Sequence, residues 1–151
     1  MTLVEAIKKA RRVYLIGNGG SAANAIHIAN DLVLSCGVKA HALTADVAIL
    51  TAIGNDNGYE YVFSRQLEVY GEPGDLLIAL SGSGNSPNII KALLAASKIG
   101  MDTYSVVGDF CKSAAPSLSV NCISTGTSMQ DAEDLQLRVG HAAMRGLKAP
   151  A

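Results

Sequence analysis

The sequence predicts an α/β fold built on a parallel sheet. Short runs rich in leucine and β-branched residues alternate with segments of helical periodicity, which is the pattern of repeated strand-helix-strand units. Of the 151 residues 49% are hydrophobic and 15 are glycine, which favours a sheet buried on both faces. The length fits one core, and no linker, repeat or low-complexity tract divides the chain. We therefore expect a single domain over residues 1–151.

The elements follow from the same alternation, taken in order along the chain. Thr2 and Glu5 have the spacing of a capping box that opens a short leading helix. Strands are expected at about residues 12–16, 39–43, 75–80, 102–107 and 118–123. Helices are expected at about residues 21–35, 45–53 with 59–70, 87–99 and 129–147, with a short turn near 112–115. Ligands of such sheets bind beyond the carboxyl ends of the strands, so the loops after Ile16 and Leu80 are the first candidates for a site.

The loop after the third strand, Ser81 to Ser86, has the sequence SGSGNS. Its hydroxyls can bind an anion, its glycines allow close backbone approach, and the following helix N-terminus adds a partial positive charge. Ser86 suits the cap of that helix and Pro87 its first position. An ordinary capped turn would explain these two residues but would leave Ser81 and Ser83 unexplained. We therefore interpret the loop as a phosphate cradle.

The loop after the first strand, Gly17 to Ala22, reads GNGGSA and formally matches the dinucleotide fingerprint G-x-G-x-x-A. A nucleotide site also needs an acidic residue near the end of the second strand, and Asp46 comes late for that role. A tight turn whose glycines serve close packing is the alternative. Because a second, serine-rich anion loop is present, the pair of loops favours a phosphorylated sugar and no nucleotide cofactor. Asn18 and Ser21 would then bind sugar hydroxyls while the serines of the second loop hold the phosphate.

Two pairs of ionisable residues have helical spacing. His27 and Asp31 are four residues apart, so both side chains leave one helix face about 6 Å apart along the axis. This spacing suits a shared metal ion or an acid-base pair, although by itself it is more often a solvated helix face. Glu133 and His141 share a face of the last helix with a separation of about 12 Å. They would have to lean together to meet one ion.

The segment Gly54 to Gly58, GNDNG, is a polar break between two helical segments. It can be a helix terminator followed by a restart. It can equally supply Asn55 and Asp56 as ligands of sugar hydroxyls, and the spacing does not decide between these two interpretations.

Charge and composition exclude several classes of partner. The formal net charge is −1 without a basic run, so neither nucleic acid nor an anionic membrane is expected as a main partner. No stretch of about 18 apolar residues and no signal segment is present. Cys36, Cys111 and Cys122 are odd in number and lack metal-finger spacing. We therefore expect the three cysteines to be free thiols in a reducing compartment, and the protein to be cytoplasmic.

Together these stretches carry a family resemblance. The chain resembles the SIS (sugar isomerase) domain family over about residues 12–147, and within it the branch that isomerises phosphorylated heptoses. Each motif is weak alone, and their combination is specific. The matching stretches are GNGGS at 17–21, His27, GND at 54–56, FSR at 63–65, SGSGNS at 81–86, and His141.

The resemblance implies a fold and a site. The fold is a flavodoxin-like three-layer α/β/α sandwich with a five-stranded parallel sheet. The active sites lie between the subunits of a homotetramer. The implied substrate contacts are Asn18, Gly19, Gly20, Ser21, Asn55, Asp56, Ser81, Gly82, Ser83, Ser86 and Glu133. The residues implied to hold one zinc ion per subunit are His27, Asp31, Glu133 and His141.

The implied chemistry is aldose-ketose isomerisation of sedoheptulose 7-phosphate to D-glycero-D-manno-heptose 7-phosphate. A proton moves between C1 and C2 through an enediol, with Asp31 as base and His141 as its acid/base partner. Two positions depart from the family. Asp31 replaces a glutamate and is shorter by one methylene, about 1.5 Å, and Glu133 replaces a glutamine, which adds a negative charge.

Two other functions stay open on the sequence alone. The chain could be a non-catalytic SIS module that binds phosphosugars or a protein partner, as the bacterial DnaA initiator-associating protein does within this family. A nicotinamide-binding enzyme would rest on the first glycine loop only.

Overall fold

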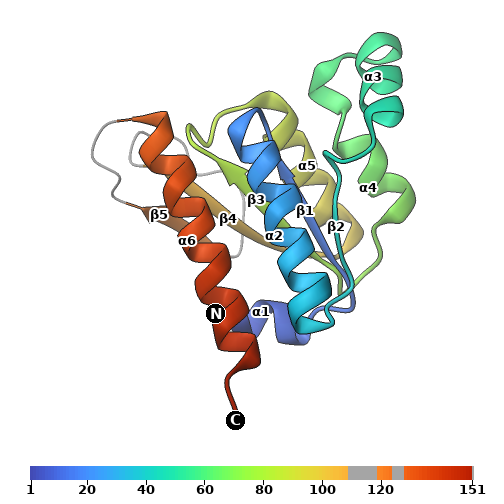
Figure 1. Ribbon diagram of the computed structural model, residues 1–151. Coiled ribbons are helices and arrows are strands. Elements are labelled where there is room, and N and C mark those ends of the chain that lie inside the picture. Colours follow the sequence, from blue (N-terminus) through green and yellow to red (C-terminus); the bar gives the residue numbers. More distant parts are fainter. Residues whose placement is uncertain (109–118, 124–127, 151) are drawn as a thin grey trace.

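The computed structural model describes residues 1–108, 119–123 and 128–150 and arranges them in three layers (Figure 1). The middle layer is a parallel sheet in the order β2-β1-β3-β4-β5. Its strands are β1 (Val13–Gly17), β2 (Ala40–Ala42), β3 (Leu76–Ser81), β4 (Asp102–Gly108) and β5 (Ser119–Ile123). The predicted α/β fold with a parallel sheet is confirmed. The turn expected near residues 112–115 lies outside the described residues.

Helices cover both faces of the sheet. One face carries α1 (Leu3–Lys9), α2 (Gly20–Cys36) and α6 (Met129–Lys148). The other face carries α4 (Ser64–Tyr70) and α5 (Pro87–Ile99), with α3 (Val47–Asp56) and the short 3-10 helix η1 (Tyr59–Tyr61) before them. The helix expected over residues 59–70 is thus divided into η1 and α4. Among the described residues, no helix combines the length and the apolar character that crossing a bilayer requires.

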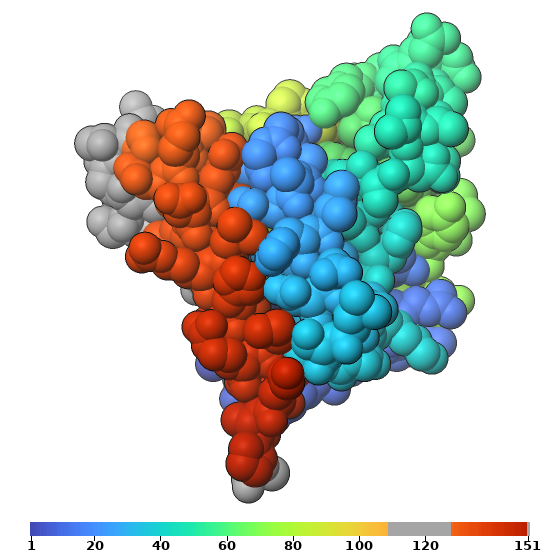
Figure 2. All heavy atoms as spheres, viewed as in Figure 1, coloured from blue at the N-terminus to red at the C-terminus, as the bar shows by residue number. Residues whose placement is uncertain are grey.

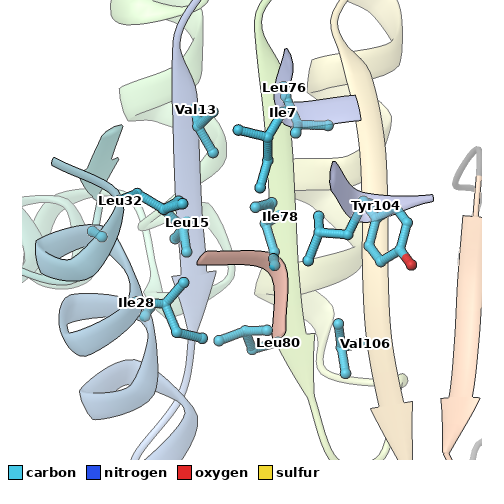
Figure 3. Packing of buried hydrophobic residues seen from close by; sticks show 14 of the residues in the cluster. Ile7, Val13, Leu15, Ile28, Leu32, Leu76, Ile78, Leu80, Tyr104 and Val106 are labelled. Atoms are coloured by element: carbon cyan, nitrogen blue, oxygen red, sulfur yellow. The ribbon is translucent and has the colours of Figure 1, made fainter. Parts of the chain in front are cut away.

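The central strands are buried on both sides, which explains their continuous apolar sequences. Along β1, Val13 and Leu15 pack under α1, α2 and α6, whereas Tyr14 and Ile16 pack under α4 and α5. Figure 3 shows the first of these two cores, in which Ile28 of α2 contacts the same layer of strand residues. Successive strand side chains alternate between the two faces, so each strand serves two cores at once.

The predicted capping box at the start of α1 is confirmed. The backbone N–H of Thr2 donates to Glu5 Oε2 at 2.7 Å, and the N–H of Glu5 donates to Thr2 Oγ1 at 3.2 Å. The first of these bonds lowers the pKa of the Glu5 carboxyl below its ordinary value, because it favours the ionised form. The box therefore orients the start of the helix that packs under the sheet.

The strand order brings the two glycine-containing loops together. The chain leaves β1 toward β2 on one side and returns to β3 on the other, so β1 and β3 form the switch point of the sheet. Gly17 at the end of β1 lies opposite Leu80 of β3. The loops that follow these strands are consequently neighbours at the carboxyl edge of the sheet.

Candidate functional site

Both predicted loops line one small cavity. It measures about 70 Å³, and its walls are Asn18, Ser21, Leu80, Ser81, Gly82, Ser83, Ser86 and Met129. Two of its hydroxyls are oriented by the loop itself. Ser81 Oγ accepts the N–H of Gly84 at 3.0 Å, and Ser83 Oγ accepts the N–H of Asn85 at 3.2 Å. Because each oxygen acts there as an acceptor, its own O–H proton is the group that can be donated to an anion.

Ser86 differs from the expectation that it caps α5. It occupies the N-cap position, with Pro87 at the first helical position, but its side chain makes no capping hydrogen bond. Its carbonyl accepts the N–H groups of Ile89 and Ile90 at 3.0 and 3.1 Å. The helix thus starts without the Ser86 hydroxyl, which instead lines the cavity.

The first glycine loop is tightly packed, and this packing explains two of its glycines. A Cβ on Gly17 would lie 2.6 Å from the backbone carbonyl of Ser21, and one on Gly20 would collide with the Glu133 carboxylate. Gly19, the N-cap residue of α2, has a φ of 56°. The Glu133 carboxylate therefore sits at the N-terminus of α2, where the helix dipole favours a negative charge. A pyrophosphate would need the same place, so this arrangement disfavours the dinucleotide interpretation.

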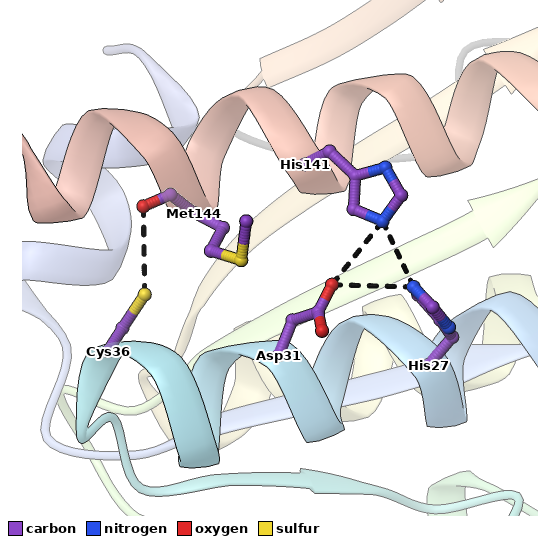
Figure 4. Close-up of polar contacts among 5 residues, drawn as sticks. All are labelled: His27, Asp31, Cys36, His141 and Met144. Carbon is purple, nitrogen blue, oxygen red and sulfur yellow. Dashed lines mark hydrogen bonds and ion pairs between the residues drawn. The ribbon is translucent and has the colours of Figure 1, made fainter.

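Three of the four predicted metal-ligating residues converge (Figure 4). The Nε2 atoms of His27 and His141 are 3.0 Å apart, and Asp31 Oδ2 lies 3.4 Å from each of them. Ligand atoms around a tetrahedral zinc ion, with bonds of about 2.0–2.1 Å, are separated by about 3.3–3.4 Å. The two distances from Asp31 match this spacing, and the distance between the two histidine nitrogens is slightly shorter.

The shorter side chain of Asp31 reaches this cluster because α2 and α6 approach closely. Figure 2 shows the two helices side by side along the face in view. Gly140 makes the approach possible, since a Cβ there would lie 2.5 Å from Ile28 Cγ1. The next residue of α6 is His141. Asp31 Oδ2 thus comes within 3.4 Å of His141 on the facing helix in spite of the missing methylene.

The cluster lies at the surface and is open to a ligand. The side chains of His27, Asp31 and His141 are 49%, 20% and 38% exposed. A second contact between α2 and α6, also drawn in Figure 4, joins the free thiol of Cys36 to the carbonyl oxygen of Met144 at 3.7 Å. The side chains of Cys111 and Cys122 lie outside what the structure describes.

Five other predicted site residues belong neither to the cluster nor to the cavity lining: Gly19, Gly20, Asn55, Asp56 and Glu133. Glu133 is not among the ligand atoms that meet within 4.8 Å in the described part of the chain, because its carboxylate lies against Gly20. Asn55 and Asp56 are exposed at the end of α3, where Asn55 Nδ2 donates to Asp56 Oδ1 at 3.0 Å. Neither residue lines the cavity.

Sequence reasoning missed a buried polar network that joins α6 to the first turn of α2. Gln136 Oε1 accepts a hydrogen bond from Asn24 Nδ2 at 2.9 Å, and Gln136 Nε2 donates to Ser21 Oγ at 3.0 Å. Gln136 lies on the buried stripe of α6 with Ala132 and Gly140. A polar residue at four-residue spacing among small buried residues was the available signal. Asn88, which is buried beside the cavity, was missed as well.

Comparison with known proteins finds a matching family model and similar proteins of known structure. The sequence model of the SIS domain matches residues 1–108. A phosphoheptose isomerase of Chlorobaculum parvum is 39% identical over 147 residues, which are 92% of this chain and 70% of that protein. One from Akkermansia muciniphila is 41% identical over 152 residues, 91% of this chain and 75% of that protein. The solved phosphoheptose isomerase of Neisseria gonorrhoeae superposes with a TM-score of 0.83 at 33% identity, covering 96% of this chain and 80% of that one.

Proposed function

Because this chain belongs to the SIS domain family, we propose that it is a phosphosugar aldose-ketose isomerase that interconverts sedoheptulose 7-phosphate and D-glycero-D-manno-heptose 7-phosphate. The observation that carries this proposal is the convergence of His27, Asp31 and His141 on one point. Phosphoheptose isomerases that match more than nine-tenths of the chain support the choice of substrate. We assign residues 1–151 to one SIS domain of a cytoplasmic protein.

The phosphate and the sugar are assigned to different groups of residues. The hydroxyls of Ser81, Ser83 and Ser86, with the backbone at Gly82, hold the phosphate. Their O–H protons and the N-terminus of α5 both suit an anion, so no lysine is needed there. The sugar hydroxyls are assigned to Asn18, Gly19, Gly20, Ser21 and Glu133 around the first turn of α2.

Asn55 and Asp56 are assigned to a site that is completed by a neighbouring copy. Both side chains are exposed at the end of α3, so they are accessible to a substrate held by another subunit. This assignment follows the homotetramer that the family resemblance implies. The proposed assembly is therefore a homo-oligomer, with four subunits as the expected number.

Proton transfer is assigned to Asp31 and His141. Both histidine contacts of Asp31 use Oδ2, and we assign Oδ1 as the atom that takes the proton from carbon. In the metal-free protein His141 is assigned the exchange of the sugar-oxygen proton, because an imidazole can both accept and donate a proton. His27 lies 3.0 Å from His141 and holds its ring in place from the opposite helix.

The same three residues fit a zinc ion, with His27 Nε2, Asp31 Oδ2 and His141 Nε2 as its ligands. Zinc held there would supply Lewis-acid polarisation of the sugar carbonyl. Glu133 would serve as a fourth ligand only if its carboxylate left the N-terminus of α2.

One assay tests the proposal directly. Metal-stripped and zinc-loaded protein would be incubated with sedoheptulose 7-phosphate and with a panel of shorter phosphosugars, and the aldose product would be measured. We expect turnover of the seven-carbon substrate. Failure to form any aldose in either metal state would exclude an isomerase. Binding of the substrate without turnover would favour a non-catalytic SIS module.

The serine assignments predict an effect on substrate affinity. Replacing Ser83 or Ser86 by alanine is expected to raise KM for sedoheptulose 7-phosphate by about 10-fold or more, because a hydrogen bond to a charged group contributes about 1.5–3 kcal/mol. Steady-state kinetics would measure this change. Ser97→Ala, at an exposed position near the end of α5, is the matched control. An unchanged KM in both loop variants would remove the phosphate assignment.

A further inference from the structure

The two loops of the site are joined by a pair of side-chain amides. Asn18 Nδ2 donates to Asn88 Oδ1 at 3.0 Å, and Asn88 Nδ2 donates to Asn18 Oδ1 at 2.8 Å. Asn18 belongs to the loop after β1, and Asn88 is the second residue of α5, which follows the serine loop. The pair therefore spans the switch point of the sheet, and it joins the element that carries the sugar contacts to the element that carries the phosphate cradle.

We propose that Asn88 is a positioning residue that holds Asn18 and the serine loop in a fixed arrangement. The hydrogen bond to Asn88 leaves Asn18 a single N–H with which to recognise an acceptor oxygen of the substrate. This inference rests on the proposed function for the identity of the substrate. Asn88 is only 2% exposed and is not among the residues that line the cavity, whereas Asn18 lines it. Asn88 thus acts through Asn18 and does not touch the ligand itself.

The hydrogen-bonding capacity of an amide limits Asn18 to acting as a donor toward a ligand. An asparagine side chain offers two acceptor lone pairs on its oxygen and two donor hydrogens on its nitrogen. Asn18 Oδ1 already accepts from Asn88 Nδ2 and from the Tyr59 hydroxyl at 3.0 Å, and Asn18 Nδ2 already donates one hydrogen to Asn88. One N–H is left for a ligand. Asn18 should therefore bind a carbonyl, phosphate or hydroxyl oxygen as a donor only.

Tyr59 is the outer member of this arrangement. Tyr59 is 61% exposed, yet its hydroxyl donates a hydrogen bond to Asn18 Oδ1. The 3-10 helix that carries Tyr59 is tied to α5 through Lys91, whose ammonium lies 3.6 Å from Glu60 Oε2 and 4.7 Å from the centre of the Tyr61 ring. The same α5 thus supports both partners of Asn18 Oδ1, which orients the amide.

A double-mutant cycle tests the positioning role. The wild-type protein, Asn18→Ala, Asn88→Ala and the double variant would be titrated with sedoheptulose 7-phosphate by calorimetry, and kcat and KM would be measured in parallel. We expect Asn88→Ala to weaken binding about 10-fold, and the double variant to bind no more weakly than Asn18→Ala, because Asn88 acts through Asn18. Losses that multiply in the double variant, or an unchanged affinity in Asn88→Ala, would overturn the proposal.

Further variants keep the test decisive. Asn88→Leu keeps the branched shape without adding a charge and loses both hydrogen bonds to Asn18, so it serves the same test if Asn88→Ala does not fold. Asn18→Asp is expected to bind no more tightly than Asn18→Ala, and retained affinity in Asn18→Asp would overturn the donor assignment.

Asn30→Ala on the exposed face of α2 controls for loss of an asparagine. Because the calorimetric affinities do not depend on turnover, an absent isomerase activity in the wild type would be distinguished from a failure of the amide pair.

Discussion

Replacing Asp31 by asparagine is expected to lower kcat for sedoheptulose 7-phosphate by about 1,000-fold, within the range of about 100- to 10,000-fold that a positioned general base contributes. Asparagine keeps the shape of the side chain and removes the carboxylate that we assign to proton abstraction. The contacts of Asp31 are made by Oδ2 to both histidines at 3.4 Å, so the change should leave the helix pair in place. The effect should therefore fall on turnover more than on folding.

Three measurements make this result interpretable. Steady-state kinetics gives kcat, thermal unfolding reports folding, and the zinc content of the purified protein shows whether loss of a ligand contributes. Asp134→Asn, at an exposed position of α6, is the matched control and should keep wild-type turnover. A kcat within threefold of the wild type in Asp31→Asn would contradict the catalytic assignment (about 0.7 kcal/mol in the barrier).

A related substitution tests the departure from the family. Asp31→Glu restores the longer carboxylate, yet it is expected not to raise kcat. The Asp31 oxygen already lies within 3.4 Å of both histidines, so an extra methylene of about 1.5 Å would displace the carboxylate from its present place. An increase in kcat would show that the approach of the two helices does not compensate for the shorter side chain.

Gly140→Ala is expected to lower the free energy of unfolding by about 1–3 kcal/mol, the usual cost of inserting a methyl group into a well-packed interface. The added Cβ would lie 2.5 Å from Ile28 Cγ1, so α2 and α6 would have to separate. Since His141 follows directly, its ring would move away from Asp31 and His27. A displacement of about 1 Å in such a site can cost on the order of 100-fold in rate, so turnover should fall as well.

Denaturant unfolding and zinc titration would measure the two consequences together. Gly54→Ala is the matched control, because Gly54 is also helical but a Cβ there would meet only Val62 Cγ1 at 4.0 Å. That control should be neutral or stabilising by up to about 1 kcal/mol. If Gly140→Ala unfolded like the wild type and kept its zinc affinity, close packing at Gly140 would not be what holds the cluster together.

Much of the fold could be predicted because its determinants are local. The capping box at Thr2 and Glu5 joins residues three positions apart. The apolar run of β3 and the helix that begins at Pro87 likewise follow from neighbouring residues. The division of residues 59–70 into η1 and α4 was not predicted, because Gly58, with a φ of 108°, starts a short 3-10 turn whose end no strong local signal marks.

The site could be predicted only in part. Ser81, Ser83 and Asn18 were identified as ligand-binding residues and do line one cavity. The location of the Glu133 carboxylate and the amide partner of Asn18 were missed, because each depends on residues of another element. Asn18 and Asn88 are 70 positions apart, and His27 and His141 are 114 positions apart. No local pattern encodes the distance between such side chains.

The amino-acid sequence by itself determined the order of strands and helices, the two loops at the carboxyl edge of the sheet and the residue types available for acid-base chemistry. These properties depend on periodicity, capping and turn residues, which act over a few positions. Only the tertiary structure decided that Asp31 also reaches His141, that Glu133 lies at the start of α2 and that Asn88 is hydrogen-bonded to Asn18. The reason is physical: these contacts join residues that are distant in the chain, so they depend on how closely the packed elements approach. Between α2 and α6, Gly140 permits that close approach.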